Sequence, residues 1–126
     1  MLKHIHHLAI IARDYEKSKD FYTRILELSL INEVYREERD SYKCDVKIGG
    51  GQIELFSFTN PPERLDNPEA TGLRHLCFAV DNIKEAVRWL EEKEVVCEEI
   101  RVDPLTGKQF TFFKDPDGLP LELYEL

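Results

Sequence analysis

The sequence predicts an α+β fold built from two tandem copies of one βαβββ module. Three observations carry this prediction: a repeat with one fixed offset, the same order of strand and helix patterns in both halves, and a proline-containing polar segment between them. The chain has 126 residues, the length of one ordinary domain or of two very small fused units. Since a module this small cannot bury its sheet alone, we expect the two copies to form a single domain.

The repeat appears in separate pairs of segments. His-His-Leu-Ala-Ile near the start of the chain matches Arg-His-Leu-Cys-Phe in the second half, and Ile-Glu-Leu-Phe matches Leu-Glu-Leu-Tyr. An offset of 68 positions relates His7 to His75, Glu54 to Glu122 and Gly50 to Gly118. Because independent segments agree on one offset, we interpret the chain as two copies of one unit.

The first module is expected over residues 1–58. Alternating apolar residues predict a strand over 3–12. Asp14 can then cap a helix that runs to about Leu28. Further strands are predicted near 30–36, 41–48 and 52–58, separated by a polar turn and a glycine turn.

The second module, over residues 73–126, repeats this order. A strand is predicted over 73–80, and Asp81 or Asn82 can cap a helix to about Lys93. The remaining strands are predicted near 96–102, 109–114 and 119–125. Residues 59–72 contain three prolines among polar residues and predict a linker.

Composition excludes several classes of function. The 17 Lys and Arg residues are outnumbered by 25 Asp and Glu residues, and the net charge of −8 argues against binding to nucleic acid or to an anionic membrane. No apolar run approaches the ~20 residues that span a bilayer, and the N-terminal residues lack the apolar core of a secretion signal. The three cysteines form no CxxC motif. We therefore expect free thiols and a cytoplasmic protein.

Strand alternation places the two glutamates that are related by the 68-residue offset on the face opposite their apolar neighbours. Ile53 and Leu55 share one face of a strand and Glu54 lies on the other, and Glu122 is set apart from its flanking leucines in the same way. If the leucine faces pack under the helices, a sheet curved around a cavity holds the glutamates on its concave face. That face would gather four side chains: His7, Glu54, His75 and Glu122.

Such a set is suited to a metal ion. Neutral imidazole and carboxylate groups without thiolate suit Ni, Co, Mn, Fe or Zn. Taken singly, a strand glutamate is usually a solvated residue and a strand histidine usually a hydrogen-bonded one. The same histidine-to-glutamate spacing in both halves favours the metal site over this alternative.

Several motifs resemble the vicinal-oxygen-chelate superfamily. They are His-His-Leu-Ala-Ile-Ile-x-x-Asp-Tyr-x-x-Ser-x-x-Phe-Tyr at 6–22, Ile-Glu-Leu-Phe at 53–56, Leu-Arg-His-Leu-x-Phe-x-Val-Asp at 73–81 and Asp-Pro-Asp-Gly-x-x-Leu-Glu-Leu at 115–123. The resemblance covers essentially the whole chain and is closest to short bacterial proteins similar to glyoxalase I. It implies the fold shared by glyoxalase, bleomycin-resistance proteins and dihydroxybiphenyl dioxygenase, in which paired βαβββ modules form a curved mixed sheet around a metal-binding cavity.

The resemblance also implies a ligand set. His7, Glu54, His75 and Glu122 match the order of the four metal ligands of glyoxalase I, with one pair in each module. Fosfomycin-type members are expected to lack the first carboxylate and bleomycin-binding members the whole set. Extradiol dioxygenases are mostly longer, and epimerases carry a different set at these positions. We expect one divalent metal per site, of which Ni, Zn, Co, Mn and Fe remain candidates.

The implied activity is that of a metal-dependent lyase or isomerase similar to lactoylglutathione lyase. In such an enzyme a glutamate moves a proton on the hemithioacetal of a 2-oxoaldehyde and a thiol, through a metal-bound enediolate. By position Glu122 corresponds to this base and Glu54 to its counterpart.

Similar enzymes are homodimers, so we expect a homodimer acting on a small molecule. The alternatives are an epimerase, a thiol transferase, a dioxygenase, or a protein that binds a small ligand without turnover. Candidate thiol-recognition residues are Arg13, Arg24, Arg74 and Arg101.

Overall fold

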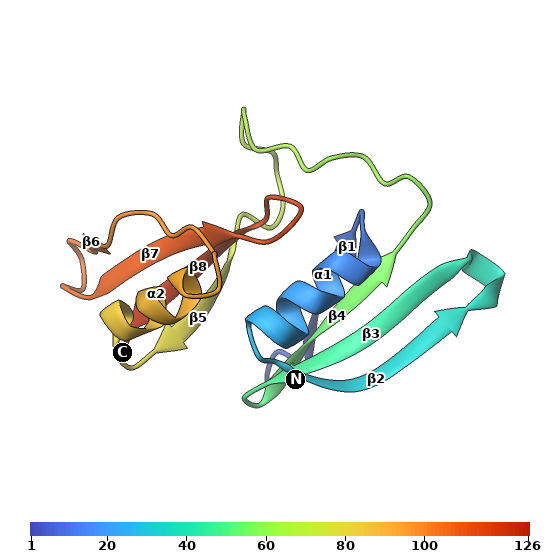
Figure 1. Cartoon of the computed structure of the whole chain (residues 1–126), viewed down its shortest axis with the longest axis horizontal. Coiled ribbons are helices and arrows are strands. Elements are labelled where there is room, and N and C mark those ends of the chain that lie inside the picture. The colour runs from blue at the N-terminus through green and yellow to red at the C-terminus, as the bar shows by residue number, and fades with distance from the viewer. The chain divides into compact units, whose positions relative to one another are not determined.

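The computed structural model describes all residues from 1 to 126 and divides into two compact units, Met1–Glu63 and Arg64–Leu126 (Figure 1). Each unit holds one four-stranded mixed sheet with a helix on one face. The predicted α+β class with tandem βαβββ modules is therefore confirmed. Neither helix is long and apolar enough to cross a lipid bilayer.

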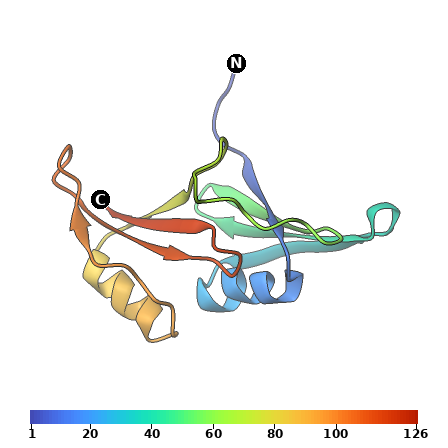
Figure 2. The ribbon, with the colours of Figure 1, turned by 90° about the horizontal axis from the view of Figure 1, so that it is seen from above.

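The first unit follows the predicted order of elements. It consists of β1 (His7–Ala12), α1 (Tyr15–Asp20) with a π-helical turn η1 (Phe21–Ile25), β2 (Ser29–Arg36), a 3-10 turn η2 (Glu37–Arg39), β3 (Ser41–Ile48) and β4 (Gly51–Ser57). The strand order is β1-β4-β3-β2, in which β1 is parallel to β4 and the other pairs are antiparallel. Figure 2 shows α1 lying along one face of this sheet.

The first helix differs from the regular helix that the sequence predicts. Asp14 does cap it, since its side chain accepts a hydrogen bond from the backbone N–H of Lys17. The α-helical part ends at Asp20 and a π-helical turn follows, in which the N–H of Leu26 donates to the carbonyl of Phe21 at 2.9 Å. This wider turn lets two successive aromatic residues, Phe21 and Tyr22, both be buried.

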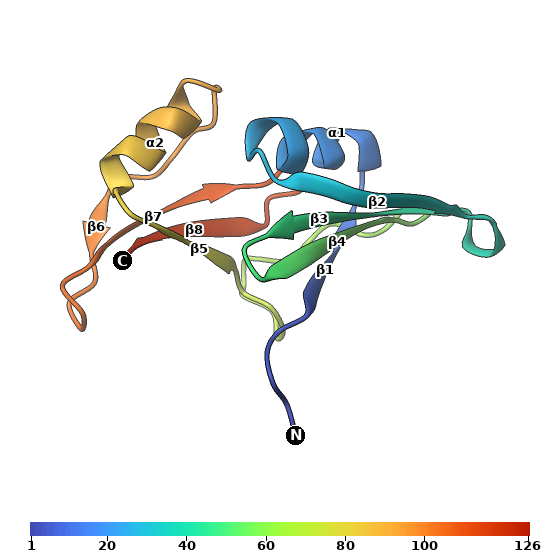
Figure 3. The same ribbon diagram turned by 90° about the horizontal axis from the view of Figure 1, so that it is seen from below.

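The second unit repeats this architecture. It consists of β5 (Leu76–Val80), α2 (Ile83–Glu91), β6 (Arg101–Val102), β7 (Gln109–Lys114) and β8 (Pro120–Glu125), with strand order β5-β8-β7-β6. Of the two candidate caps, Asn82 is the one used, and its side chain accepts from the N–H of Glu85. Figure 3 shows α2 over one face of the sheet, where Ile83 and Leu90 are buried. Residues 64–72 belong to this unit, while the predicted division at 1–58, 59–72 and 73–126 stays a prediction.

The strand predicted over 96–102 is much shorter in the structure. Only Arg101 and Val102 pair with β7. Further back, the N–H of Glu98 donates to the carbonyl of Phe112 at 2.8 Å, but the Glu98 carbonyl accepts from the Thr111 hydroxyl instead of a backbone N–H. Because a side chain takes this position, no continuous ladder forms along 96–100.

The second helix carries the only tryptophan of the chain, Trp89. Its indole ring is half-buried, and the ammonium group of Lys93 lies 4.0 Å from the ring centroid. This cation–π contact joins successive turns at the C-terminal end of α2. The tryptophan fluorescence of the chain therefore reports on the second unit.

The repeat offset is not uniform along the structure. Leu8 pairs with Ile53, and Leu76 pairs with Leu121, so the first and last strands of each module keep the offset of 68. On β3 and β7 the offset is 67, because the partner of Glu54 is Asp45 and the partner of Glu122 is Phe112. The hairpin after β7 is one residue longer than the hairpin after β3, which restores the offset on the last strand. The glycines with positive φ in the two hairpins are accordingly Gly49 and Gly118, not the sequence-matched Gly50.

A charged cluster on the helix side of the first unit gives a test of this packing. Lys19 donates to Glu33 at 2.8 Å and the Tyr15 hydroxyl donates to the same carboxylate at 2.6 Å. These contacts hold the pKa of Glu33 below its usual value, with the Lys19 hydrogen bond as the main cause. The pairing therefore stabilises the folded state above the unfolded pKa of 4.5 and loses its effect as the pH falls through the lower folded pKa.

We expect Glu33→Gln to lower the free energy of unfolding by about 1 kcal/mol at pH 7, because the ion pair is lost while an acceptor for Tyr15 remains. The difference from the wild type should shrink as the pH falls below 4.5 and vanish once the pH is below the lower folded pKa. Urea unfolding between pH 2.5 and 7 measures it. Glu38→Gln, at an exposed position without a partner, is the matched control. A difference independent of pH would contradict the assignment.

Candidate metal centre

Each sheet has a face opposite its helix that carries one of the two candidate glutamates, and we call it the glutamate face. In the first unit, Ile53 and Leu55 are buried under α1 while Glu54 points to the other side. In the second unit, Leu121 and Leu123 are buried and Glu122 lies on the opposite face. The alternation predicted from the sequence is therefore confirmed in both units.

The structure brings His7 and Glu54 together. In the parallel pairing of β1 with β4, Gln52 is the partner of His7, and Glu54 lies one step further along the same face. The Nδ1 atom of His7 is 3.7 Å from a carboxylate oxygen of Glu54. The same Nδ1 lies 2.9 Å from Nδ1 of His6, so one imidazole of this pair donates to the other.

A second carboxylate and an ammonium group stand beside Glu54. Asp45 is its direct partner on β3, and Lys43 extends its Nζ atom to 3.0 Å from Asp45 and 3.5 Å from Glu54. The pKa of Lys43 is raised, chiefly by its hydrogen bond to Asp45. Lys43 thus neutralises part of the charge of two carboxylates that are both largely buried.

The structure also brings His75 and Glu122 together, in the second unit. His75 immediately precedes β5, and its Nε2 atom is 2.9 Å from a carboxylate oxygen of Glu122. Its Nδ1 atom is buried and has no hydrogen-bond partner. The Phe112 ring meets the imidazole edge to face, with centroids 5.1 Å apart, and forms an apolar wall beside it.

Cys77 completes the wall around Glu122. It is the direct partner of Glu122 on β5. Burial, with a smaller contribution from the nearby Glu122 carboxylate, raises the pKa of the Cys77 thiol to about 11. The side chain is therefore a neutral thiol near pH 7 and adds no anion to this site.

The two sites are unlike in their surroundings. Because of the 67-residue offset, Phe110 and Phe112 occupy in the second sheet the places that Lys43 and Asp45 occupy in the first. Glu54 thus has an ammonium partner, whereas Glu122 forms its ion pair with the histidine, and Arg74 acts on it only electrostatically. Alternation along β3 could have identified Lys43 and Asp45 from the sequence, but the change of offset hides the position of Phe112.

The four candidate ligands lie as two histidine–glutamate pairs, one in each unit. No group of three or more histidine, cysteine or acidic side chains gathers as a ready metal site, so the four-ligand set stays a prediction. Of the candidate thiol-recognition residues, Arg13 pairs with Glu63 and Arg24 with Asp20 at exposed positions. The Arg101 guanidinium lies over the Phe110 and Phe112 rings on the glutamate face. Arg74 pairs with Glu69, directly before His75.

The family of the chain follows from comparison with known proteins. The chain belongs to the Glyoxalase/Bleomycin resistance protein/Dioxygenase superfamily, whose sequence profile matches residues 4–123. This is the superfamily that the sequence motifs predict.

Among its relatives, the uncharacterized protein YwkD of Bacillus subtilis is 61% identical over 99% of this chain and 98% of its own length. The uncharacterized protein YaeR of Escherichia coli is 63% identical over 98% of this chain and 97% of its own length. The human mitochondrial methylmalonyl-CoA epimerase is 31% identical over 97% of this chain and 73% of its own length.

Solved structures agree with this family. A glyoxalase family protein from Enterococcus faecalis is 46% identical, covers 98% of each chain and has a TM-score of 0.92. The protein SMU.1112c is 44% identical, covers 99% of this chain and 100% of its own, and has a TM-score of 0.96. Activities named among more distant relatives include a lactoylglutathione lyase and a metallothiol transferase.

The lysine beside Glu54 gives a test of this centre. We expect Lys43→Met to lower the free energy of unfolding by about 2 kcal/mol, because it leaves two largely buried carboxylates without their cation. Lys43→Met combined with Asp45→Asn should recover about half of this loss. Urea unfolding at neutral pH measures both. Lys47→Met, on the same face of β3 but without an ion pair, is the control, and an equal loss there would contradict the assignment.

Proposed function

We propose that the chain is a metal-dependent lyase or isomerase that moves a proton on a small substrate with two adjacent oxygen atoms. The observation that carries the proposal is the pair of imidazole–carboxylate contacts at equivalent positions of the two modules. The proposed ligands of one divalent ion are His7, Glu54, His75 and Glu122, drawn from one chain or from two copies.

The residues fit such an ion. Imidazole nitrogen and carboxylate oxygen are ligands of Ni, Zn, Co, Mn and Fe, and no thiolate competes because Cys77 is a neutral thiol. The unpartnered, buried Nδ1 of His75 is a nitrogen that lacks the second hydrogen bond expected of a purely structural histidine. When bound, the ion supplies Lewis-acid stabilisation of negative charge on the substrate oxygens.

The surroundings of the two glutamates support different roles. Glu54 is held in an ion pair by Lys43 and is suited to a role as a metal ligand. Glu122 forms no ion pair with Lys or Arg and contacts His75 instead, so its carboxylate is the freer of the two to act on the substrate. We therefore assign the proton transfer to a carboxylate oxygen of Glu122, which removes a proton from carbon and returns it to the neighbouring carbon. Phe112 and Cys77 are the strand partners of Glu122 on its two sides.

The substrate that this chemistry favours is the hemithioacetal of a 2-oxoaldehyde and a thiol, as for a lactoylglutathione lyase. Identity of 31% with a methylmalonyl-CoA epimerase favours a second candidate, in which the proton returns to the same carbon with inverted configuration. Both reactions use one carboxylate base beside stabilised negative charge on oxygen. A thiol transferase, a dioxygenase and a protein that binds without turnover are the remaining alternatives.

We further propose a homodimer that works in the cytoplasm. The edge strand β2 exposes Leu30, Ile31, Val34 and Tyr35 on its two faces, and a second copy that packs along this edge can cover these apolar side chains. Cys44, Cys77 and Cys97 are all free thiols, which suits a reducing compartment.

Metal binding is the first test. We expect reconstituted protein to hold about one divalent ion per site, with Glu54→Gln and Glu122→Gln each weakening the affinity at least about tenfold because a charged ligand is lost. Elemental analysis and calorimetric titration with Co²⁺ measure this. Glu99→Gln, at an exposed position without a partner, should bind as the wild type does. Stoichiometry below about half an ion per chain, or unchanged affinity in both glutamine variants, would refute the ligand set.

Turnover of methylglyoxal with glutathione, beside other thiols, is the second test. We expect the metal-loaded wild type to convert one of these adducts and Glu122→Gln to lose at least about 100-fold in kcat, because the base is gone. Methylmalonyl-CoA, assayed in parallel by exchange of its C2 proton with deuterated solvent, tests the epimerase candidate. Full metal loading with no turnover of any adduct would remove the lyase assignment.

A further inference from the structure

The strand residues of the two glutamate faces carry more positive than negative charges, whereas the whole chain carries more negative than positive charges. The chain has 17 cationic and 25 acidic residues, yet the strand residues of these faces include five Lys or Arg and three carboxylates. The cations are Arg36, Lys43, Lys47, Arg101 and Lys114, and the anions are Asp45, Glu54 and Glu122. If the proposed metal ligands Glu54 and Glu122 are set aside, Asp45 is the one acidic residue left on the strands of these faces. Such sorting of charge in an acidic protein favours an anionic ligand at these faces.

The second unit provides a pocket at this face. Its volume is about 220 Å³, and it lies between the loop 64–70 and the sheet, where Phe112 and Pro120 form an apolar floor beside Lys114. This volume is below the ~300–1,000 Å³ of pockets that hold a whole small-molecule ligand, so the pocket suits one end of a substrate.

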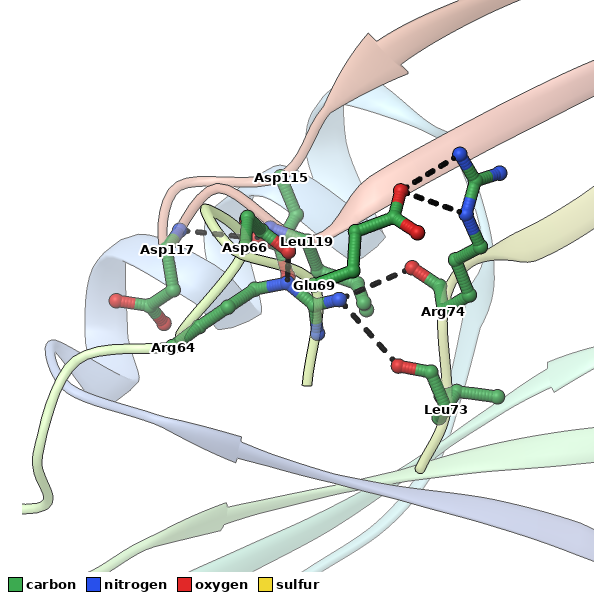
Figure 4. Close-up of polar contacts among 8 residues, drawn as sticks. All are labelled: Arg64, Asp66, Glu69, Leu73, Arg74, Asp115, Asp117 and Leu119. Atoms are coloured by element: carbon green, nitrogen blue, oxygen red, sulfur yellow. Dashed lines mark hydrogen bonds and ion pairs between the residues drawn. The ribbon is translucent and has the colours of Figure 1, made fainter. Parts of the chain in front are cut away.

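The loop that closes this pocket is held by Arg64. Figure 4 shows its guanidinium between the Asp66 carboxylate, at 2.7 Å, and the carbonyls of Leu73 and Arg74, at 3.3 and 3.0 Å. These bonds tie the loop to the residues that lead into His75. Because a charged guanidinium makes all three contacts, the wall of the pocket is pre-organised.

Three acids and three cations line the pocket, but one of the cations has no anionic partner. Each of its three acids already has a cation: Asp66 pairs with Arg64, Glu69 pairs with Arg74, and Glu98 pairs with Arg101. The ammonium group of Lys114 has neither an ion pair nor a hydrogen bond. Because Glu98 pairs with Arg101, which lies outside the lining, Lys114 is the one cation of the pocket that is left without an anionic partner.

The pocket adjoins the proposed metal ligands of the same unit. Lys114 is the partner of Pro120 on β8, and His75 lies level with Pro120 on the other side of that strand. Phe112, in the floor of the pocket, contacts the His75 ring and is the strand partner of Glu122. A molecule with one end in the pocket can therefore extend past Phe112 toward His75 and Glu122.

We propose that the pocket binds an oxyanion group, a carboxylate or a phosphate, at one end of the substrate, and that Lys114 is the residue that selects it. The role as a substrate pocket rests on the proposed function, whereas the oxyanion site itself does not. Lys114 supplies the attractive charge, and the paired guanidiniums of Arg64 and Arg74 keep the surrounding acids neutralised. A neutral substrate of the same shape lacks this contact.

Anion titration of the full chain without added metal tests the oxyanion site directly. Inorganic phosphate and acetate are added separately at constant ionic strength, and amide shifts are followed by ¹H–¹⁵N spectroscopy. We expect saturable shifts in residues 64–70 and in β7 with at least one anion. The anion that binds more tightly identifies the group. Lys114→Gln should weaken binding about tenfold, and Lys114→Arg should remain within about threefold of the wild type because it keeps the charge.

Lys84→Gln is the matched control, since this exposed lysine lies on α2, on the opposite side of the sheet. It should bind both anions as the wild type does. No saturable shift with either anion, or equal affinity in Lys114→Gln and wild type, would overturn the proposal. Because this titration needs neither metal nor turnover, a failure here is separate from a failure of the metal-dependent activity.

Discussion

The parallel pairing of the first and last strand in each module is the constraint on which the candidate centre depends. It sets His7 one step from Glu54 and His75 one step from Glu122, on the face that the helix does not cover. Side chains alternate along a strand, so a slip of one residue would turn each glutamate under its helix and expose the buried leucines. The apolar residues beneath α1 and α2 therefore hold the register that presents the histidine–glutamate pairs.

On this common scaffold the two modules have become chemically different. The first surrounds its glutamate with Asp45 and Lys43, and the second surrounds its glutamate with aromatic rings and a neutral thiol. A charged environment and an apolar one favour different functions for the same side chain. The loop before β5 adds a further difference, because the contacts of Arg64 build a pocket beside the second pair. The repeat thus explains why each module carries one histidine–glutamate pair, and the departures from the repeat explain why the surroundings of the two pairs differ.

Much of this arrangement could be predicted from the sequence, because it depends on local patterns. Strand alternation placed Ile53 and Leu55 opposite Glu54, and capping residues marked both helix starts, Asp14 for the first and either Asp81 or Asn82 for the second. Features that depend on pairing between distant segments could not be predicted. The single-residue shift of β7 against the repeat needs the hairpin geometry, and the replacement of a ladder bond by the Thr111 hydroxyl needs the neighbouring strand. The contacts of Arg64 are of the same kind, since backbone carbonyls are present at every position and carry no sequence signal.

The placement of Trp89 on α2 has a consequence for how the folding of this chain is observed. Each unit has its own buried core, but tryptophan fluorescence reports only on the second unit. Loss of the Lys93 contact and exposure of the indole would mark unfolding of the second unit, while far-ultraviolet dichroism sums the helices and strands of both. Superposition of the two transitions would show that the modules unfold as one cooperative system, and separation of the two would show that each is an autonomous folding unit.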